Sequence, residues 1–481
     1  MTSYSRRSFV GTATGAAAAY AAGDGWIDLF DGKSLNGWIA AENISTWKVS
    51  SGNLTNDGPR SHLFYVGADP NSPPVFKNFE LEAEVLARPY CNSGLFFHTK
   101  VQTSGFPVKG FEVQINNTAL GEGTYRERKK TGSLYSIRNI YKQIAPDDQY
   151  MRLHLLVRGK NIQIWINDIQ TVDYTEPTPP VLPPSSERER FLDRGTFALQ
   201  GHDPTSRSLW RKVRVKPLPD NATAPGTQAP VVDDIFRKVI ELGSKNYPLV
   251  DFNVHLKGGL DLPAALAKSR RDGINYGILA NCGRNQPIHD DASAAKHLES
   301  LKGVCAFSGM QVEGSDWLKT FSRITCSKFD YILSDAVTAM PPEAGTVNNL
   351  QEFMDTHVRN IVAMLEHEPI DIYANPTYLP ESIKASYDTL WTEDRLRKVI
   401  GAAAINGVAL ELNNRNKLPN ERAVRMAKEL RCKFTFGSSN SNATDLRRCE
   451  YGLQMTELCK LSWNDLWVPG AIGTKAIDRK K

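Results

Sequence analysis

Phe79-Glu-Leu-Glu-Ala-Glu-Val85 alternates apolar and acidic residues with a period of two, and Phe111-Glu-Val-Gln-Ile115 repeats this kind of alternation further along the chain. Successive side chains of a β-strand point to opposite faces, so each stretch predicts a strand with one apolar and one polar face. Residues 161–168 and 195–202 indicate further strands, and residues 26–217 show almost no helical periodicity. The first half of the chain is therefore predicted to be an all-β sandwich or jelly roll.

The pattern changes after residues 217–230, a segment with four prolines and no hydrophobic periodicity, which is typical of a linker. Beyond it, strands and helices alternate. Strands are expected at 249–255, 276–282, 304–312, 331–335, 370–375, 408–412 and 434–437, and helices at 262–272, 350–367, 393–404 and 420–430. Seven such units favour an α/β barrel. The expected organisation is a sandwich at 25–218, a linker at 219–230 and a barrel at 231–481.

Length and composition agree with two soluble domains. The 481 residues exceed one ordinary core, and the net charge of +5 is not gathered into a long basic run, so nucleic acid is not a favoured partner. No stretch approaches the roughly 18 apolar residues of a membrane span. The seven cysteines are scattered without a C-x-x-C pair. They are predicted to be mostly small buried hydrophobes rather than a disulfide framework.

The N-terminus carries the features of an export signal. Ser5-Arg-Arg-Ser-Phe-Val10 precedes an Ala- and Gly-rich stretch at 11–22, and Ala19-Tyr-Ala21 offers a small-x-small cleavage site. This order predicts a twin-arginine signal peptide at residues 1–22. A merely disordered start is the alternative. Export would place the mature protein in the periplasm or outside the cell.

The polar faces of the predicted strands form a candidate sugar site. Carboxylate and amide groups match sugar hydroxyls, and aromatic rings can stack on a sugar ring. A solvated polar outer face is the alternative. The candidate residues are Glu112, Gln114, Asn116, Tyr135, Trp165, Gln200 and His202.

A family resemblance favours the sugar site. Five motifs follow one another in order: Gly25 to Trp38, Asn92-Ser-Gly-Leu-Phe-Phe97, Gly110 to Ile115, Thr131-Gly-Ser-Leu-Tyr135 and Leu199-Gln-Gly-His202. Together they resemble the 3-keto-disaccharide hydrolase family, also called the domain of unknown function 1080, over residues 25–218. The resemblance implies a concanavalin-like jelly roll that cleaves glycosides carrying a ketone at C3. The chain departs from the family at Trp210 and Lys212, where we expect Phe and Asn.

The chemistry implied by this resemblance needs a base. A ketone at C3 acidifies the proton on C2, so a general base can remove it and the C1 substituent can then leave. We nominate Glu112 or His202 as the base, with Gln114 and Gln200 binding the 3-keto sugar. The basic loop from Tyr125 to Lys130 is expected to be solvated; an anionic-substrate site is the alternative.

The barrel half carries its own candidate site. Asp251 to Leu260, Phe329 to Asp335 and Lys433 to Gly437 resemble the PHP family, named for polymerase and histidinol phosphatase, which folds as a distorted seven-stranded barrel. Polar residues also fall at the expected carboxyl ends of the strands, where barrel enzymes place their sites. Four of them could hold one divalent metal ion: His255, Glu313, Asp335 and Glu411.

Two departures argue against a working metal site. Asn253 and Asn375 stand where this family would place histidine ligands, and an amide is a poor ligand. A degenerate barrel is therefore expected. The alternative function is a carbohydrate-binding sandwich that delivers substrate to a metal-dependent phosphoesterase or hydrolase barrel.

Overall fold

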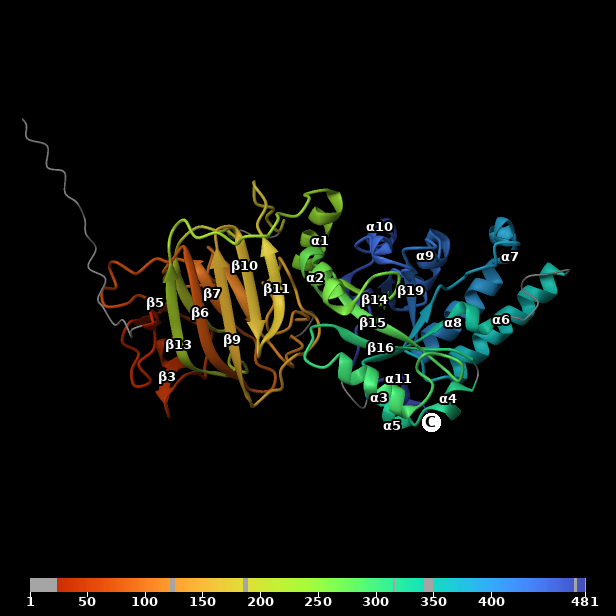
Figure 1. The fold of residues 1–481 in the computed structure, drawn as a ribbon, viewed down its shortest axis with the longest axis horizontal. Coiled ribbons are helices and arrows are strands. Elements are labelled where there is room, and N and C mark those ends of the chain that lie inside the picture. The colour runs from red at the N-terminus through yellow and green to blue at the C-terminus, as the bar shows by residue number, and fades with distance from the viewer. Residues whose placement is uncertain are drawn as a thin grey trace, which may run out of the picture.

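The computed structural model describes residues 24–121, 126–184, 189–314, 316–340, 349–470 and 474–480. They form two domains that lie side by side (Figure 1). The expected export signal at residues 1–22 lies outside the described residues. Within the described part of the chain, no helix is both long enough and apolar enough to cross a membrane.

The N-terminal domain is a sandwich of two antiparallel sheets, drawn from red to yellow in Figure 1. The larger sheet has the order β11-β10-β9-β6-β13-β4-β3, with β1 paired to β13, and the smaller has the order β2-β5-β12-β7-β8. The bounds are β1 Ile27–Asp28, β2 Trp38–Ala40, β3 Trp47–Ser50, β4 Asn53–Asn56, β5 Ser61–Tyr65, β6 Asn78–Ala87, β7 Ser93–Thr99, β8 Phe111–Ile115, β9 Tyr150–Arg158, β10 Asn161–Ile166, β11 Ile169–Thr175, β12 Thr196–Gly201 and β13 Ser208–Leu218.

The two alternating stretches form strands β6 and β8, each with an apolar face and a polar face as predicted. Phe111, Val113 and Ile115 are buried in the core between the sheets. On β6, the acidic residues face outward instead, and Glu82 accepts hydrogen bonds from Arg214 while Glu84 accepts one from Lys212. Lys212, which departs from the family pattern, thus pairs with a carboxylate on the outer face of the larger sheet.

The C-terminal domain is a closed barrel of seven parallel strands surrounded by helices, as the alternation predicted. Its order is β14-β15-β16-β17-β18-β19-β20. The strands are β14 Val250–His255, β15 Asn275–Cys282, β16 Phe307–Val312, β17 Tyr331–Asp335, β18 Ile372–Ala374, β19 Ala409–Asn413 and β20 Phe434–Gly437.

Helices cover the barrel, and their ends coincide with capping residues. Asp261 caps α2 by accepting a hydrogen bond from Ala264 N, and Gly273 ends it in the left-handed region, which favours glycine. Thr392 and Gly407 play the same parts in α8. The helices are α1 Asp234–Ser244, α2 Leu262–Asp272, α3 Asp291–Ser300, α4 Trp317–Thr320, α5 Arg323–Ser327, α6 Leu350–His367, α7 Tyr387–Leu390, α8 Glu393–Asn406, α9 Glu421–Glu429, α10 Glu450–Leu458 and α11 Ala476–Arg479.

The first barrel helix belongs to both cores. In α1, Phe236 and Ile240 join the hydrophobic cluster of the sandwich, whereas Val239 and Leu242 join that of the barrel. The two domains therefore share a packed helix directly after the linker.

A sandwich segment, residues 126–142, docks on the barrel. Tyr141 Oη donates to the carbonyl of Tyr247, 2.8 Å away, and Lys142 Nζ lies 3.1 Å from Asp330 Oδ2. Tyr247 and Asp330 lie just before β14 and β17. The barrel therefore presents the amino ends of its strands to the sandwich, and the carboxyl ends point away.

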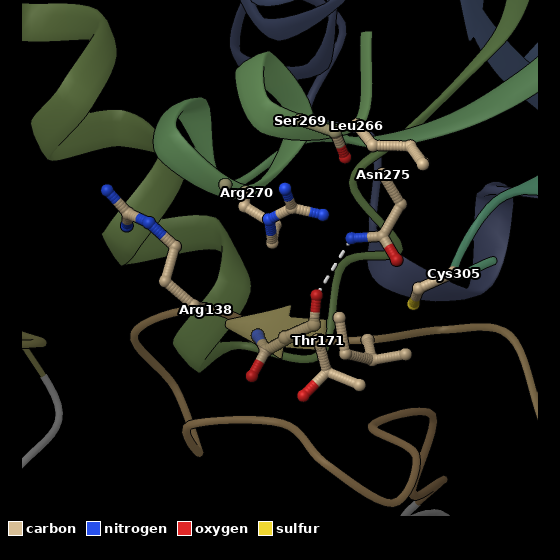
Figure 2. A pocket seen from close by; sticks show the side chains of 10 residues that line it. Arg138, Thr171, Leu266, Ser269, Arg270, Asn275 and Cys305 are labelled. Atoms are coloured by element: carbon tan, nitrogen blue, oxygen red, sulfur yellow. Dashed lines mark hydrogen bonds between the residues drawn. The ribbon is translucent and has the colours of Figure 1, made fainter. Parts of the chain in front are cut away.

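The interface is closely packed. Figure 2 shows the small cavity left between Arg138 and Thr171 of the sandwich and Arg270, Asn275 and Cys305 of the barrel. Its volume of about 10 Å³ leaves room for about one water molecule. All seven cysteines are described and are free thiols, and six of them are buried, as expected for small hydrophobes.

Candidate functional site

The outer face of the smaller sheet brings several predicted residues together. Residues opposite each other in paired antiparallel strands point to the same side of the sheet. Pairing joins Phe64 to Ala198, Ala198 to Phe96, and Phe96 to Glu112. This row crosses four strands, and Glu112 stands at its end on β8.

A second row lies beside the first. His62 is opposite Gln200 on β5 and β12, and Gly94 is opposite Gln114 on β7 and β8. The two rows form one face of the sheet, called here the polar face, on which Glu112, Gln114 and Gln200 lie beside a small hydrophobic cluster of Phe64, Phe96 and Ala198.

Glu112 leans across this face towards the second row. Gln200 Nε2 donates to Glu112 Oε1 at 3.4 Å. A Cβ atom placed on Gly94 would lie only 2.7 Å from the same oxygen. Gly94 is therefore required for the carboxylate to occupy its position.

The polar face is buried, so the alternative of a solvated outer face does not hold. Glu112, Gln114 and Gln200 are 3%, 1% and 2% exposed. Gln114 donates through Nε2 to Asn92 Oδ1 at 2.7 Å. The Oε1 atoms of Gln114 and Gln200, however, accept no hydrogen bond from any residue that the structure describes. Buried acceptors normally have partners, and sugar hydroxyls are donors of the right kind.

Asn116 lies next to this face, and its side chain holds a neighbouring segment by a hydrogen bond. It is fully buried, and its Nδ2 donates to the carbonyl of Lys129 at 3.0 Å. It thus anchors the segment that follows β8.

His202 lies just beyond β12 and is part of a histidine–carboxylate pair. Its Nδ1 is 2.8 Å from Asp203 Oδ2. Burial raises the pKa of Asp203, but hydrogen bonds from His202, Thr205 and Ser206 outweigh it and hold that pKa well below its ordinary value. An ionised Asp203 favours the tautomer with the proton on Nδ1, which leaves Nε2 as the basic nitrogen.

An aromatic residue connects His202 to the second row. The ring of Phe106 lies 5.4 Å from His202 and 5.4 Å from His62, measured between centroids. The guanidinium of Arg60 also stacks on this ring at 5.1 Å. Phe106 therefore provides an apolar surface at one end of the polar face, as sugar sites commonly do.

Tyr135 extends the first row beyond β8. Val113 pairs with Leu134, and Tyr135 N donates to the carbonyl of Glu112 at 2.9 Å. Tyr135 is therefore the neighbour of Glu112 on the same face. Its ring contacts two cations, Lys129 Nζ at 4.3 Å and the guanidinium of Arg190 at 5.3 Å.

The basic loop is only partly solvated where the structure describes it, because Arg126 is exposed and Arg128 and Lys130 are half-buried. Glu127 and Lys129 are 2% and 1% exposed, and Tyr135 Oη donates to Glu127 Oε2 at 3.1 Å. The expectation of a solvated loop is therefore wrong for Glu127 and Lys129, which pair with each other, and Lys129 also contacts Asn246 of the barrel half. Residues 122–125 lie outside the described part.

Trp165 does not lie on this face. It belongs to β10 of the larger sheet and stacks on His154 of β9, with centroids 4.8 Å apart. Its neighbours Ile164 and Ile166 are buried in the core, so Trp165 points outward from the opposite sheet. The nomination of Trp165 for the sugar site is therefore wrong, because the sequence could not specify which sheet its strand joins.

Carboxylates at the carboxyl ends of the barrel strands are bonded to amides. Glu313 Oε1 accepts hydrogen bonds from Asn281 and Gln311, each at 3.0 Å. Asp335 Oδ2 accepts one from Asn375 Nδ2 at 2.6 Å. The amides thus donate to the oxygens that a cation would bind.

Glu411 is also bonded to asparagines, and it is almost fully buried. Oε1 accepts from Asn253 Nδ2 at 2.8 Å, and Oε2 accepts from Asn413 Nδ2 at 2.9 Å and from the backbone N of Asn375 at 2.8 Å. Burial raises the pKa of Glu411 to about 7, although these hydrogen bonds lower it. Asn253 and Asn375, the two departures from the family pattern, both donate here.

The candidate metal site is therefore not formed by the described residues. Among the residues that the structure describes, no three His, Cys, Asp or Glu side chains are grouped so that they could hold a metal ion. His255 is buried, which lowers its pKa to about 4. The set of His255, Glu313, Asp335 and Glu411 does not fit a divalent ion because amide donors already satisfy its carboxylates.

Comparison with known families finds a match over the sandwich. Residues 25–216 match the model of the 3-keto-alpha-glucoside-1,2-lyase-like domain. The match ends within β13, so the barrel lies outside it. No curated protein is significantly similar in sequence to this chain.

Solved structures with similarity to this chain include two proteins of Parabacteroides distasonis provisionally assigned as glycosyl hydrolases. They have 18% and 17% identity and TM-scores of 0.34 and 0.31, and cover 41% and 40% of this chain and 95% and 99% of their own. The carbohydrate-binding module CBM66 of Bacillus subtilis has 13% identity and a TM-score of 0.25, covering 37% of this chain and 95% of its own. The similarity to a known family is a sequence match over residues 25–216, which make up less than half of the chain.

Sequence reasoning missed several residues at this site. His62 and Phe106 carry no local signal, because only the pairing of β5 with β12 and the path of the loop bring them to Gln200 and His202. Gly94 lies inside the quoted motif Asn92 to Phe97. A glycine within a strand indicates close approach of another group, so this residue could have been found.

Proposed function

We propose that the protein is an exported enzyme that cleaves 3-keto-glycosides on the buried polar face of its sandwich. The supporting observation is the pair of buried acceptors, Gln114 Oε1 and Gln200 Oε1, beside Glu112 and without donors among the described residues. The family match of residues 25–216 supports the same chemistry.

In the proposed reaction, a base removes the C2 proton of a sugar whose C3 carries a ketone. The electron pair of the C2–H bond forms an enolate with its charge on the C3 oxygen. That charge then expels the C1 substituent, which leaves with a proton as an alcohol, and water adds to the resulting double bond. Glu112 is the first candidate for the base, because its carboxylate leans across the face to within hydrogen-bond distance of Gln200.

His202 is the second candidate for the base and is also suited to protonating the leaving group. Its contact with Asp203 orients the imidazole, as an orienting carboxylate does in other acid–base pairs. Gln114 and Gln200 would accept hydrogen bonds from substrate hydroxyls. Phe106 would contact an apolar face of the sugar. Positive charge near Tyr135 would favour the enolate.

Binding of sugar without cleavage is the second candidate function, since the same acceptors would hold an unreactive glycoside. We also propose that the barrel is a degenerate relative of the PHP family, supported by its seven parallel strands and by Asn253 and Asn375. Residues 1–22 supply the sequence argument for export.

The test uses the full chain and a simple substrate such as methyl 3-keto-α-glucoside. Wild type is expected to release methanol and to exchange the C2 hydrogen with deuterium from solvent. Glu112→Gln and His202→Ala are each compared with it. Full activity in both variants would overturn the assignment of the site. Binding without methanol release by wild type would favour the second candidate function.

A further inference from the structure

The segment 126–142 touches both the candidate sugar site and the barrel. On one side, Tyr135 neighbours Glu112 on the polar face. On the other side, the same segment carries contacts to the barrel. A change in the barrel can therefore reach the site through this segment.

Lys129 is the central residue of the connection. It is 1% exposed, and its Nζ donates to Asn246 Oδ1 of the barrel half. The same atom lies 3.5 Å from Glu127 Oε1 and 4.3 Å from the centre of the Tyr135 ring. Burial lowers the pKa of Lys129, while the charges of Glu127 and Glu112 raise it. Because a buried ammonium group is costly without partners, these contacts define where Lys129 lies.

Asn246 holds the segment at two points. Besides accepting from Lys129, it donates through Nδ2 to the carbonyl of Arg126 at 2.7 Å. It lies between α1 and β14, is 7% exposed, and has a φ of 66°. Asparagine and glycine are the residues that adopt this left-handed conformation most readily.

We propose that the barrel acts as a brace for the sugar site and that Asn246 is the positioning residue through which it does so. Asn246 holds Lys129, and Lys129 with Glu127 holds the ring of Tyr135 beside Glu112. For the reaction itself, this inference rests on the proposed function. The contacts by which Asn246 holds the segment do not depend on the proposed function.

The brace has a chemical consequence. Lys129 and Arg190 are cations that contact the ring of Tyr135, the next residue in the row after Glu112. Positive charge held in place beside a developing enolate stabilises the transition state more than mobile charge does. Release of the segment should therefore lower kcat rather than only weaken substrate binding.

The test compares two asparagines that span the same interface. Asn246→Gly removes both hydrogen bonds but keeps a residue suited to the left-handed backbone. Asn275→Ala is the matched control. Asn275 is 6% exposed and also makes two hydrogen bonds across the interface, accepting from Tyr141 N and donating to the carbonyl of Asn139. These two bonds reach Asn139 and Tyr141 and do not involve Lys129.

Two measurements are made on the full chain, namely kcat and KM on methyl 3-keto-α-glucoside and hydrogen exchange of the backbone amides at 126–135. Asn246→Gly is expected to lower kcat about tenfold or more, as misplaced active-site groups do, and to speed exchange in this segment. Asn275→Ala is expected to leave both within about twofold of wild type. Asn246→Asp keeps the acceptor for Lys129 and should recover most of kcat. If Asn246→Gly does not fold, Asn246→Ser, whose side chain is too short for both hydrogen bonds, replaces it with the same expected losses.

Wild-type kcat or unchanged exchange at 126–135 in Asn246→Gly would overturn the brace. An equal loss of kcat in Asn275→Ala would also overturn it, because the effect would then be general to the interface. If wild type shows no cleavage at all, the proposed function fails, and the exchange measurement still decides whether Asn246 holds the segment.

Discussion

The two domains each place a buried glutamate against a glycine, and the surroundings of the two pairs differ. In the sandwich, Glu112 lies over Gly94, and in the barrel Glu411 lies over Gly437. Both carboxylates are almost fully buried. Glu411 accepts three hydrogen bonds from asparagines.

The amides next to Glu112 are arranged differently. Gln114 and Gln200 keep one buried acceptor each that receives no hydrogen bond from the described residues. In the barrel network, Asn253 Oδ1 also accepts no hydrogen bond from the described residues, but both oxygens of Glu411 are occupied by amide donors of the protein, which stabilises the fold and leaves this carboxylate little capacity to bind a ligand. Buried acceptors that receive no hydrogen bond from the protein can bind a ligand that donates hydrogen bonds. We infer that the sandwich face is a site and the barrel end is a structural network.

The largest expected effect separates these two networks directly. Glu112→Gln should lower kcat on methyl 3-keto-α-glucoside by about 10²- to 10⁴-fold, the usual contribution of a general base. Glu313→Gln, at the carboxyl end of the barrel strands, should leave kcat unchanged. Steady-state kinetics on both variants measures the difference. Comparable losses in the two variants would contradict the assignment of separate roles.

The two glycines offer the next test. In Gly94→Ala the new Cβ would lie 2.7 Å from Glu112 Oε1, so the carboxylate must move and kcat should fall at least about tenfold. In Gly437→Ala the new Cβ would lie 1.7 Å from Glu411 Oε1. That overlap should cost roughly 1–3 kcal/mol of stability while the folded fraction keeps its activity. Thermal unfolding and kinetics together distinguish the outcomes. A stable, inactive Gly437→Ala would be inconsistent with a purely structural barrel network.

A pH dependence should mark the barrel network. The folded-state pKa of Glu411 is raised from 4.5 to about 7, so the folded protein binds this proton more tightly than the unfolded chain. Its contribution to stability is present below pH 4.5 and is lost as pH rises to 7. Between pH 4.5 and pH 8, wild type should lose on the order of 3 kcal/mol relative to Glu411→Gln. Denaturant unfolding of both proteins at the two pH values measures this. A pH-independent difference would show that Glu411 titrates normally.

The smallest effect is expected at Trp165. Trp165→Ala removes a ring stacked on His154 on the outer face of the larger sheet. Activity should stay within about twofold of wild type, because surface substitutions away from a site change little. Kinetics on the same substrate checks this. A large loss of kcat would mean that the catalytic face is the larger sheet.

Much of the fold follows from local patterns. The alternation in residues 111–115 placed Glu112 and Gln114 on one face, and capping residues such as Asp261 and Gly273 agree with the predicted bounds of α2. The polar ends of the barrel strands were also located correctly. The hydrogen-bond partners of their carboxylates could not be predicted, because the bonds from Asn253 and Asn375 depend on where distant strands meet.

The site could be predicted only in part. Gln200 and Glu112 meet because β12 and β8 both flank β7, which no window of the sequence contains. The burial of Lys129 likewise depends on Asn246, a residue of the other half of the chain. Charge in a loop predicts solvent exposure unless a second domain covers it.

The sequence by itself determined the two kinds of domain, the strand faces and the helix ends, because side-chain periodicity and capping act over a few neighbouring residues. The tertiary structure decided which polar residues share a surface, which carboxylates are already satisfied and which loop is buried. These properties depend on contacts between residues far apart in the chain, and burial changes the cost of every polar group that it encloses.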